Sequence, residues 1–175
     1  MYLIVTRSFP PEAGGMQNLM WGLTNAISKH YMVKVFADQN DDSKSLDKNV
    51  SFSIERIGGP KLIRKYRKAY LVNDFIKNNK NIRGVIADHW KSLELIKTKK
   101  KKICLIHSKE INHKKGSILN RRVLKVLNNI DYVVSNSNYT KNLAISCGVN
   151  NNKIIVINPG IEPLKKLSKN ILFEA

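Results

Sequence analysis

The stretch FPPEAGGMQN, at residues 9–18, decides the fold. It follows the apolar run Tyr2–Val5 and precedes a helical pattern at 15–29. Proline fixes the backbone angle φ and glycine carries no side chain, so the turn is stiff and its end is sterically open. The first N–H groups of a helix are unpaired, so a phosphate could approach the backbone at Gly14 and Gly15. The alternative is a tight strand-to-helix connection whose glycines serve only the turn.

The bulk composition predicts one soluble globular domain. The chain has 175 residues, of which 42% are hydrophobic, enough to bury a core. No apolar run has the length of a membrane helix, and Tyr2–Val5 is too short for a signal-peptide core, so a cytoplasmic location is expected. Cys104 and Cys147 are too few and too far apart for a disulfide scaffold or a zinc knuckle.

The net charge is unusual. Lys and Arg number 31 against 13 Asp and Glu, which gives +18. Such a surface attracts polyanions: nucleic acid, anionic lipid or phosphorylated substrates. The alternative is compositional, because a chain rich in Lys, Asn and Ile can reflect an AT-rich genome rather than selection on a surface.

A basic amphipathic helix is predicted at 61–77, after the break Gly58-Gly59-Pro60. The residues expected to face the core are Leu62, Ile63, Tyr66, Tyr70, Val72, Phe75 and Ile76. The residues expected to face solvent are Lys61, Arg64, Lys65, Arg67 and Lys68. A helix of this kind can lie on an anionic membrane. A solvated charged face over an ordinary core stripe explains the pattern equally well.

Strands alternate with helices along most of the chain. The expected strands lie at 2–6, 32–37, 50–57, 84–87, 103–106, 131–135 and 153–157. The expected helices lie at 15–29, 61–77, 90–97, 117–128 and 137–148, while 38–49 is predicted to be a polar loop. This alternation predicts an α/β, Rossmann-like parallel sheet with helices on both faces.

The polar residues follow the predicted strands. In sheets of this kind ligands bind beyond the carboxyl ends of the strands. The segments at those ends are 11–15, 88–90, 107–110 and 137–140. They supply the candidate site residues.

Five motifs together resemble a known family. They are FPPEAGG at 9–15, KHYMVKVF at 29–36, IHS at 106–108, DYVVSNSNYT at 131–140 and CGVNNNKIIVINPGIE at 147–162. In this order and spacing, the chain resembles the N-terminal half of GT-B glycosyltransferases, specifically the family 4-like enzymes that use nucleotide-sugar donors. The resemblance covers nearly the whole chain.

The resemblance implies roles for individual residues. Gly14 and Gly15 match the glycine pair near the donor diphosphate, and His107 matches a cleft histidine that contacts the transferred sugar or the acceptor. We take His107 as the candidate catalytic residue, with a structural histidine as the alternative. A histidine at a strand end can also handle protons near neutral pH. Glu110 is close enough in sequence to orient it.

Further donor-binding or substrate-binding candidates are less specific. Ser137 and Thr140 match a polar pair at a helix N-terminus, for which simple N-capping is the alternative. Asp88 and His89 are looser matches to the family pattern. No metal or other cofactor is expected, since the nucleotide sugar is a substrate and the four histidines lack metal-ligand spacing.

The resemblance also predicts the domain organisation. Residues 1–160 would form the N-terminal, acceptor-side domain, and 161–175 would begin the interdomain linker. One departure is Asn158-Pro159-Gly160, where family members commonly have the proline before the asparagine. The C-terminal, donor-binding domain is absent from these 175 residues, so we expect this chain to be inactive alone, because transfer needs both substrates held in register.

The sequence is consistent with three functions. The first is a retaining, metal-independent hexosyltransferase of polysaccharide biosynthesis, with a glycan or lipid-linked acceptor and a peripheral position on the inner face of the membrane. The second is a basic, non-catalytic module that binds an anionic membrane or nucleic acid. Nucleic acid is disfavoured because no reading motif is present and only 7% of residues are aromatic. The third is a half-enzyme or remnant that needs a partner chain.

Overall fold

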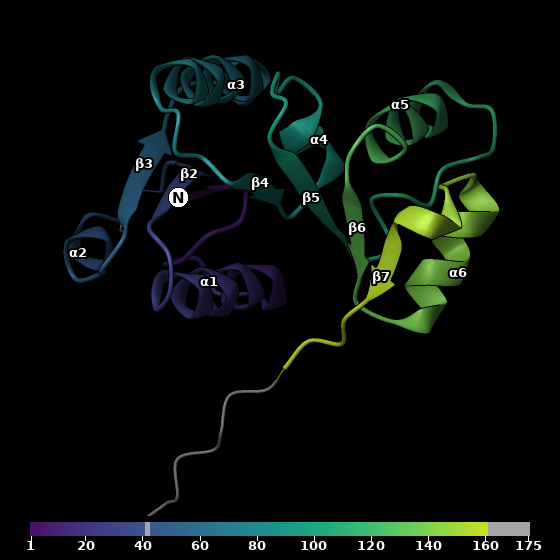
Figure 1. Cartoon of the computed structure of the whole chain (residues 1–175), viewed down its shortest axis with the longest axis horizontal. Helices are drawn as coiled ribbons and strands as arrows, with labels where there is room; N and C mark the ends of the chain where they lie inside the picture. The colour runs from purple at the N-terminus through teal and green to yellow at the C-terminus, as the bar shows by residue number, and fades with distance from the viewer. Residues whose placement is uncertain (41–42, 161–175) are drawn as a thin grey trace, which may run out of the picture.

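The structure, a computed structural model, describes residues 1–40 and 43–160 (Figure 1). Its strands are β1 (Tyr2–Val5), β2 (Val33–Asp38), β3 (Ser53–Ile57), β4 (Gly84–Ala87), β5 (Lys101–Ile106), β6 (Tyr132–Ser135) and β7 (Ile154–Val156). Its helices are α1 (Gly15–Ser28), α2 (Ser43–Lys48), α3 (Lys61–Asn78), α4 (Trp90–Leu93), α5 (Ile118–Leu127), α6 (Asn138–Cys147) and the short 3₁₀ helix Asn151–Lys153. Every predicted strand and helix is found, and α2 replaces part of the predicted loop. The predicted linker at 161–175 lies outside the described residues.

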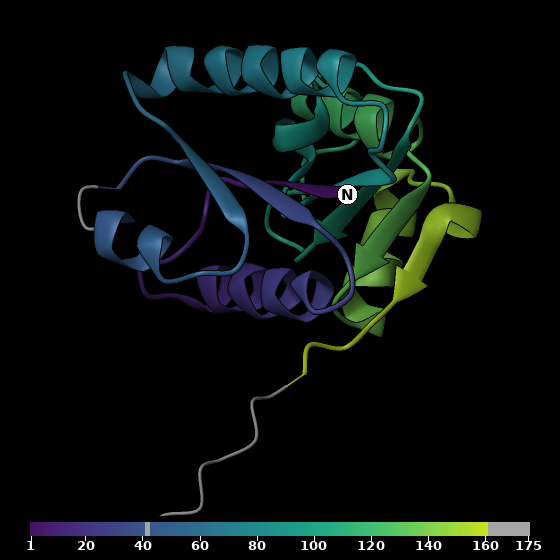
Figure 2. The same cartoon turned by 60° about the vertical axis from the view of Figure 1, so that its left-hand side comes forward.

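The strands form one parallel sheet in the order β3-β2-β1-β4-β5-β6-β7. The central strand β1 is paired on both sides: Tyr2 is opposite Val33 in β2 and Gly84 in β4. Parallel strands need crossovers, and crossovers are right-handed. After β3, at one edge of the sheet, the chain passes back over β2 and β1 and forms β4 on the far side of β1. The direction of the connections is therefore reversed, so α1 and α2 lie on one face and α3, α4, α5 and α6 on the other (Figures 1 and 2). The predicted fold class is confirmed.

Each face of the sheet has its own core. On β1, Ile4 contributes to the core under α1, together with Met20 of that helix. Leu3 and Val5 contribute to the larger core on the opposite face. This alternation is the two-residue period of a strand buried on both faces.

Helix α3 departs from the predicted orientation in its first half. The residues predicted to be buried but found exposed are Leu62, Ile63, Tyr66 and Tyr70. Lys68, predicted to be exposed, is buried. The reason is electrostatic, because Asp38 at the end of β2 and Glu94 after α4 lie beneath the helix. Arg64 and Lys68 pair with Asp38, and Lys65 pairs with Glu94.

Over residues 1–40 and 43–160, none of the helices has the length and apolar character needed to cross a bilayer.

Candidate active site at the carboxyl edge of the sheet

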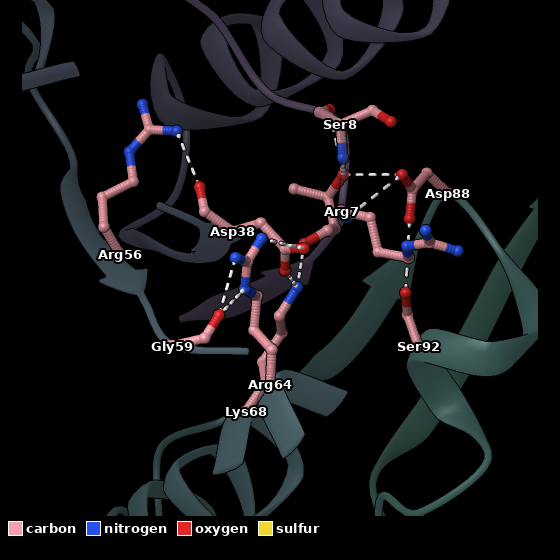
Figure 3. Close-up of polar contacts among 10 residues, drawn as sticks. Arg7, Ser8, Asp38, Arg56, Gly59, Arg64, Lys68, Asp88 and Ser92 are labelled. Carbon is pink, nitrogen blue, oxygen red and sulfur yellow. Dashed lines mark hydrogen bonds and ion pairs between the residues drawn. The ribbon is translucent and has the colours of Figure 1, made fainter. Parts of the chain in front are cut away.

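The strand order reverses between the parallel neighbours β1 and β4, because β1 leads to β2 on one side and β4 to β5 on the other, and the candidate site is centred there. Adjacent strands whose connections leave in opposite directions open a crevice at their carboxyl ends. Thr6 follows β1 and Asp88 follows β4, and both side chains are buried. The Thr6 hydroxyl donates a hydrogen bond to Asp88 Oδ2 at 2.7 Å, and the Arg7 N–H lies 3.4 Å from the same oxygen (Figure 3). Burial raises the pKa of Asp88, and the Thr6 hydrogen bond opposes that shift.

Lys68 of α3 reaches the same place from the face of the sheet opposite α1 (Figure 3). Its ammonium donates to the Thr6 carbonyl oxygen and pairs with the Asp38 carboxylate. Burial lowers the pKa of Lys68, and the charge of Asp38 opposes that shift. Lys68 was not among the site residues predicted from the sequence. The signal that could have identified it is Asp38, a carboxylate directly after the predicted strand at 32–37.

Two arginines hold the neighbouring loops. Arg56 of β3 donates to the Pro10 carbonyl oxygen at 2.6 Å and pairs with Asp47 at 2.8 Å. Arg64 donates to the Gly59 carbonyl oxygen at 2.8 Å and pairs with Asp38 at 3.2 Å (Figure 3). Arg56 therefore anchors the Pro-rich turn that precedes α1, and each arginine is paired with a carboxylate at this edge.

The turn ends at the N-terminus of α1. Gly14 is the N-cap residue and makes no side-chain capping bond, and the first turn of α1 has no acidic residue. A Cβ added at Gly15 would meet no atom within 4 Å, whereas one at Gly14 would meet the flexible side chain of Gln17. The backbone at Gly15 is therefore open, as phosphate approach requires. The role of the glycine pair stays a prediction.

His89 caps the short helix α4. Its Nδ1 accepts a hydrogen bond from the Lys91 N–H at 3.0 Å. Burial, together with the charges of Lys91 and Arg7, lowers the pKa of His89 to about 4. Its imidazole is therefore neutral at neutral pH. The next residue, Trp90, donates from Nε1 to the Glu110 carbonyl oxygen at 2.9 Å and links the connections that follow β4 and β5.

His107 follows β5 and has an unused nitrogen. Its Nε2 is buried and has no hydrogen-bond partner among the residues that the structure describes. Burial lowers the pKa of His107, against the charges of Glu110 and Asp88. The Glu110 carboxylate accepts a hydrogen bond from the His107 backbone N–H. Glu110 therefore holds the main chain of His107, whereas the sequence suggested that it would orient the imidazole ring. Ser108 has φ of 89°, a strained conformation typical of functional sites.

Ser137 and Thr140 lie at the start of α6, after β6. The Ser137 hydroxyl accepts from the Thr140 N–H at 3.2 Å and lies 3.2 Å from the Thr140 hydroxyl. This is N-capping, the alternative that the sequence left open, and Thr140 is buried. The binding role of the pair stays a prediction.

The edge thus brings together the residues after β1, β4 and β5. Burial lowers the pKa of both histidines; the charge of Asp88 opposes that shift in the pKa of His107, and the charge of His107 adds to it in the pKa of His89. The arrangement offers an open helix N-terminus, which suits an anionic ligand, while Lys68, Arg56 and Arg64 are already paired with Asp38 or Asp47. In the described part of the chain, no three or more His, Cys, Asp or Glu side chains are placed to bind a metal ion.

Solved structures resemble this fold at low sequence identity. Anabaena HepE (Alr3699), solved with UDP-glucose, superposes with a TM-score of 0.70 at 14% identity, over 93% of this chain and 44% of that protein. Sucrose-phosphate synthase from Thermosynechococcus elongatus gives 0.71 at 16% identity, over 91% of this chain and 48% of that protein. MurG from Acinetobacter baumannii gives 0.56 at 10% identity, over 94% and 46%.

The chain therefore spans less than half the length of each of these three proteins. No curated protein matches it. The profile of Glycosyltransferase Family 4 matches residues 13–164, most of the chain. The resemblance seen in the sequence motifs is confirmed, and the chain belongs to glycosyltransferase family 4.

Proposed function

We propose that this chain is the acceptor-side half of a glycosyltransferase that moves a sugar from a nucleotide-sugar donor to a glycan or lipid-linked acceptor. The observation that carries the proposal is the family match over residues 13–164. The GT-B neighbours add support, since one of them was solved with UDP-glucose and another is a sucrose-phosphate synthase. We place the protein in the cytoplasm, where nucleotide sugars would be its donors.

In the proposed reaction, the bond between the sugar C1 and the donor phosphate oxygen breaks. A new bond forms from C1 to an acceptor hydroxyl oxygen, whose proton is lost, and the nucleoside diphosphate leaves. The unpaired N–H groups at the start of α1 would face the diphosphate near Gly14 and Gly15. We infer retention of configuration, a hexose as the transferred sugar and no metal or other cofactor. All three follow from the family resemblance.

His107 would act as a neutral hydrogen-bonding group. Burial keeps its pKa low, so it carries no charge at neutral pH that would repel an electron-poor sugar carbon. Its partnerless Nε2 is buried, so we infer that the surrounding side chains move apart on binding and that Nε2 then forms one hydrogen bond with a sugar hydroxyl. Asp88 and Lys68 would act indirectly, because their side chains bond to Thr6 and so fix the crevice between β1 and β4.

A second reading is a half-enzyme that works with a separate chain. The chain covers 44% of HepE and 48% of the synthase, which fits this reading and the first equally. Under either reading we expect residues 1–175 alone to transfer no sugar.

The test is transfer of labelled sugar from a panel of nucleotide sugars by the intact native gene product, incubated with lipid and glycan extracts of its own cells. We expect donor-dependent transfer that falls at least about tenfold in His107→Ala. His30→Ala is the matched control, because His30 is exposed at the opposite end of α1 from Gly15. Absence of transfer with every donor would refute the proposal. Transfer by the 175-residue chain alone would refute its inactivity.

A further inference from the structure

Helix α3 presents an apolar stripe to solvent. Leu62, Tyr66 and Tyr70 are spaced by four residues and so share one side of the helix. Their exposed fractions are 87%, 63% and 70%, and the neighbouring Ile63 is 60% exposed. We call these four residues the outer stripe. Four large exposed side chains in one contiguous row are uncommon on a monomer and mark an interaction surface.

The outer stripe is not needed to attach α3 to the domain. The inner side of the helix is held by the Arg64, Lys65 and Lys68 ion pairs, and its second half by buried Val72. In Figures 1 and 2 α3 is the outermost element on its face of the sheet, and within residues 1–40 and 43–160 no other element lies over its outer side. The stripe is therefore free to meet another surface.

The surroundings of the stripe are strongly cationic. Helix α3 has six basic residues and one acidic residue, Asp74. Lys61 and Arg67 are exposed beside the stripe, and Lys77 is exposed at the far end of the helix. A groove of about 440 Å³ runs between α3 and α5 next to Tyr66, and its lining includes Lys102 and Lys125. The chain as a whole carries +18.

An apolar stripe surrounded by cations fits some possible partners better than others. A second copy of the chain would bring two cationic rims together, which is repulsive. Nucleic acid would match the charge, but exposed Leu62 and Ile63 have no role on a phosphate backbone. An anionic bilayer satisfies both features, since its headgroups pair with Lys and Arg while the boundary beneath them takes aliphatic and tyrosine side chains.

We propose that the outer face of α3 binds the surface of an anionic lipid bilayer, with the outer stripe inserted at headgroup level and Lys61 and Arg67 against lipid phosphates. The inference does not rest on sugar transfer. The sequence suggested that a face of five cations would meet the membrane. In the structure three of them, Arg64, Lys65 and Lys68, face inward, so the proposed contact is made by the outer stripe instead. Since α3 begins at the carboxyl edge of the sheet, binding would bring the candidate site close to the bilayer.

The test is co-sedimentation of the 175-residue chain with phosphatidylcholine vesicles that contain or lack phosphatidylglycerol, without any donor sugar. We expect binding only to the anionic vesicles, and weaker binding as salt is raised. The double variant Leu62→Gln/Tyr66→Gln keeps the charge and should bind about tenfold more weakly. Its matched control is Ile118→Gln/Tyr139→Gln, which alters one aliphatic residue and one tyrosine that are each 72% exposed elsewhere.

A charge pair completes the design. Lys61→Gln/Arg67→Gln should weaken vesicle binding about tenfold, and Lys114→Gln/Lys115→Gln, which removes the same charge from another exposed segment, should weaken it much less. Equal losses in the charge pair would assign binding to net charge, and equal losses in the apolar pair would show that the outer stripe is not the binding surface; either result would overturn the proposal. So would equal binding to neutral vesicles, or a concentration-dependent dimer that Leu62→Gln/Tyr66→Gln abolishes.

Discussion

Replacing Thr6 by valine removes the hydrogen bond that joins the connections after β1 and β4. Valine keeps the volume and branching of the side chain, so the change is mainly the lost hydroxyl. Asp88 would keep the Arg7 N–H at 3.4 Å and the Ser92 hydroxyl at 3.5 Å, both long, and the Ser8 N–H would lose the Thr6 hydroxyl as its acceptor. A buried hydrogen bond to a charged group contributes about 1.5–3 kcal/mol, and leaving the acceptor unsatisfied adds to the loss. We expect Thr6→Val to lower the free energy of unfolding by about 2–3 kcal/mol.

The assay is urea unfolding of a double-mutant cycle with Asp88→Asn. In the Asp88→Asn background the hydrogen bond is neutral, so Thr6→Val should cost only about 1 kcal/mol, a coupling of about 1–2 kcal/mol. Thr24→Val is the matched control, because Thr24 is equally buried but donates to the Met20 carbonyl of its own helix. That change should cost less than about 1 kcal/mol. If Thr6→Val costs no more than Thr24→Val, or if the coupling is below about 0.5 kcal/mol, the reasoning is refuted.

Three further predictions concern stability. The pKa of Glu94 is about 2, below its ordinary 4.5, and the hydrogen bond from Arg122 is the largest cause of this shift. The free energy of unfolding that this pairing contributes is therefore present above pH 4.5 and is lost as the pH falls toward 2. After allowance for solvent screening we expect a loss of about 1–2 kcal/mol, and Glu94→Gln should flatten the slope of urea unfolding over that range; equal slopes would contradict this. The pKa of His89 is likewise lowered, from 6.5 to about 4, so stability should fall by at most about 3 kcal/mol as pH drops between those values. Thermal unfolding of His89→Gln should lack that fall, and a slope like that of wild type would rule it out. Gly148 ends α6 with φ of 106°, and a Cβ there would lie 3.1 Å from Leu124. Gly148→Ala should therefore lower stability by about 1–2 kcal/mol in calorimetry, and an unchanged melting temperature would show that Leu124 and the backbone adjust without cost.

Most of the fold could be predicted because its signals are local. The Pro-Gly turn at 10–15 and the break at 58–60 separate apolar segments whose periods identify strand or helix. Helix α2 was missed because SKSLDK contains a single apolar residue, Leu46, and therefore no periodicity. The orientation of α3 was wrong for a different reason. Periodicity assumes that apolar residues face inward, and here carboxylates under the helix attract its cations instead.

The candidate site was predictable only in part. Parallel topology places Asp88, His89 and His107 at one edge, and the sequence indicated that. It could not indicate which atoms are used, because those contacts join distant segments. Lys68 meets Thr6 across 62 residues, and Arg56 meets Pro10 across 46. The partnerless Nε2 of His107 also depends on packing that no local pattern encodes.

The central place of β1 has a consequence for how the polypeptide assembles. β1 is synthesised first, yet its partner β4 begins only at Gly84. Strands β5, β6 and β7 each pair with the strand made just before them, so that half of the sheet grows by short loop closures. Joining β1 to β4 closes the longest loop of the sheet and carries the largest entropic cost. The slow step of folding is therefore expected at the seam between Thr6 and Asp88, and the crevice that serves the candidate site forms only when the two halves of the sheet meet.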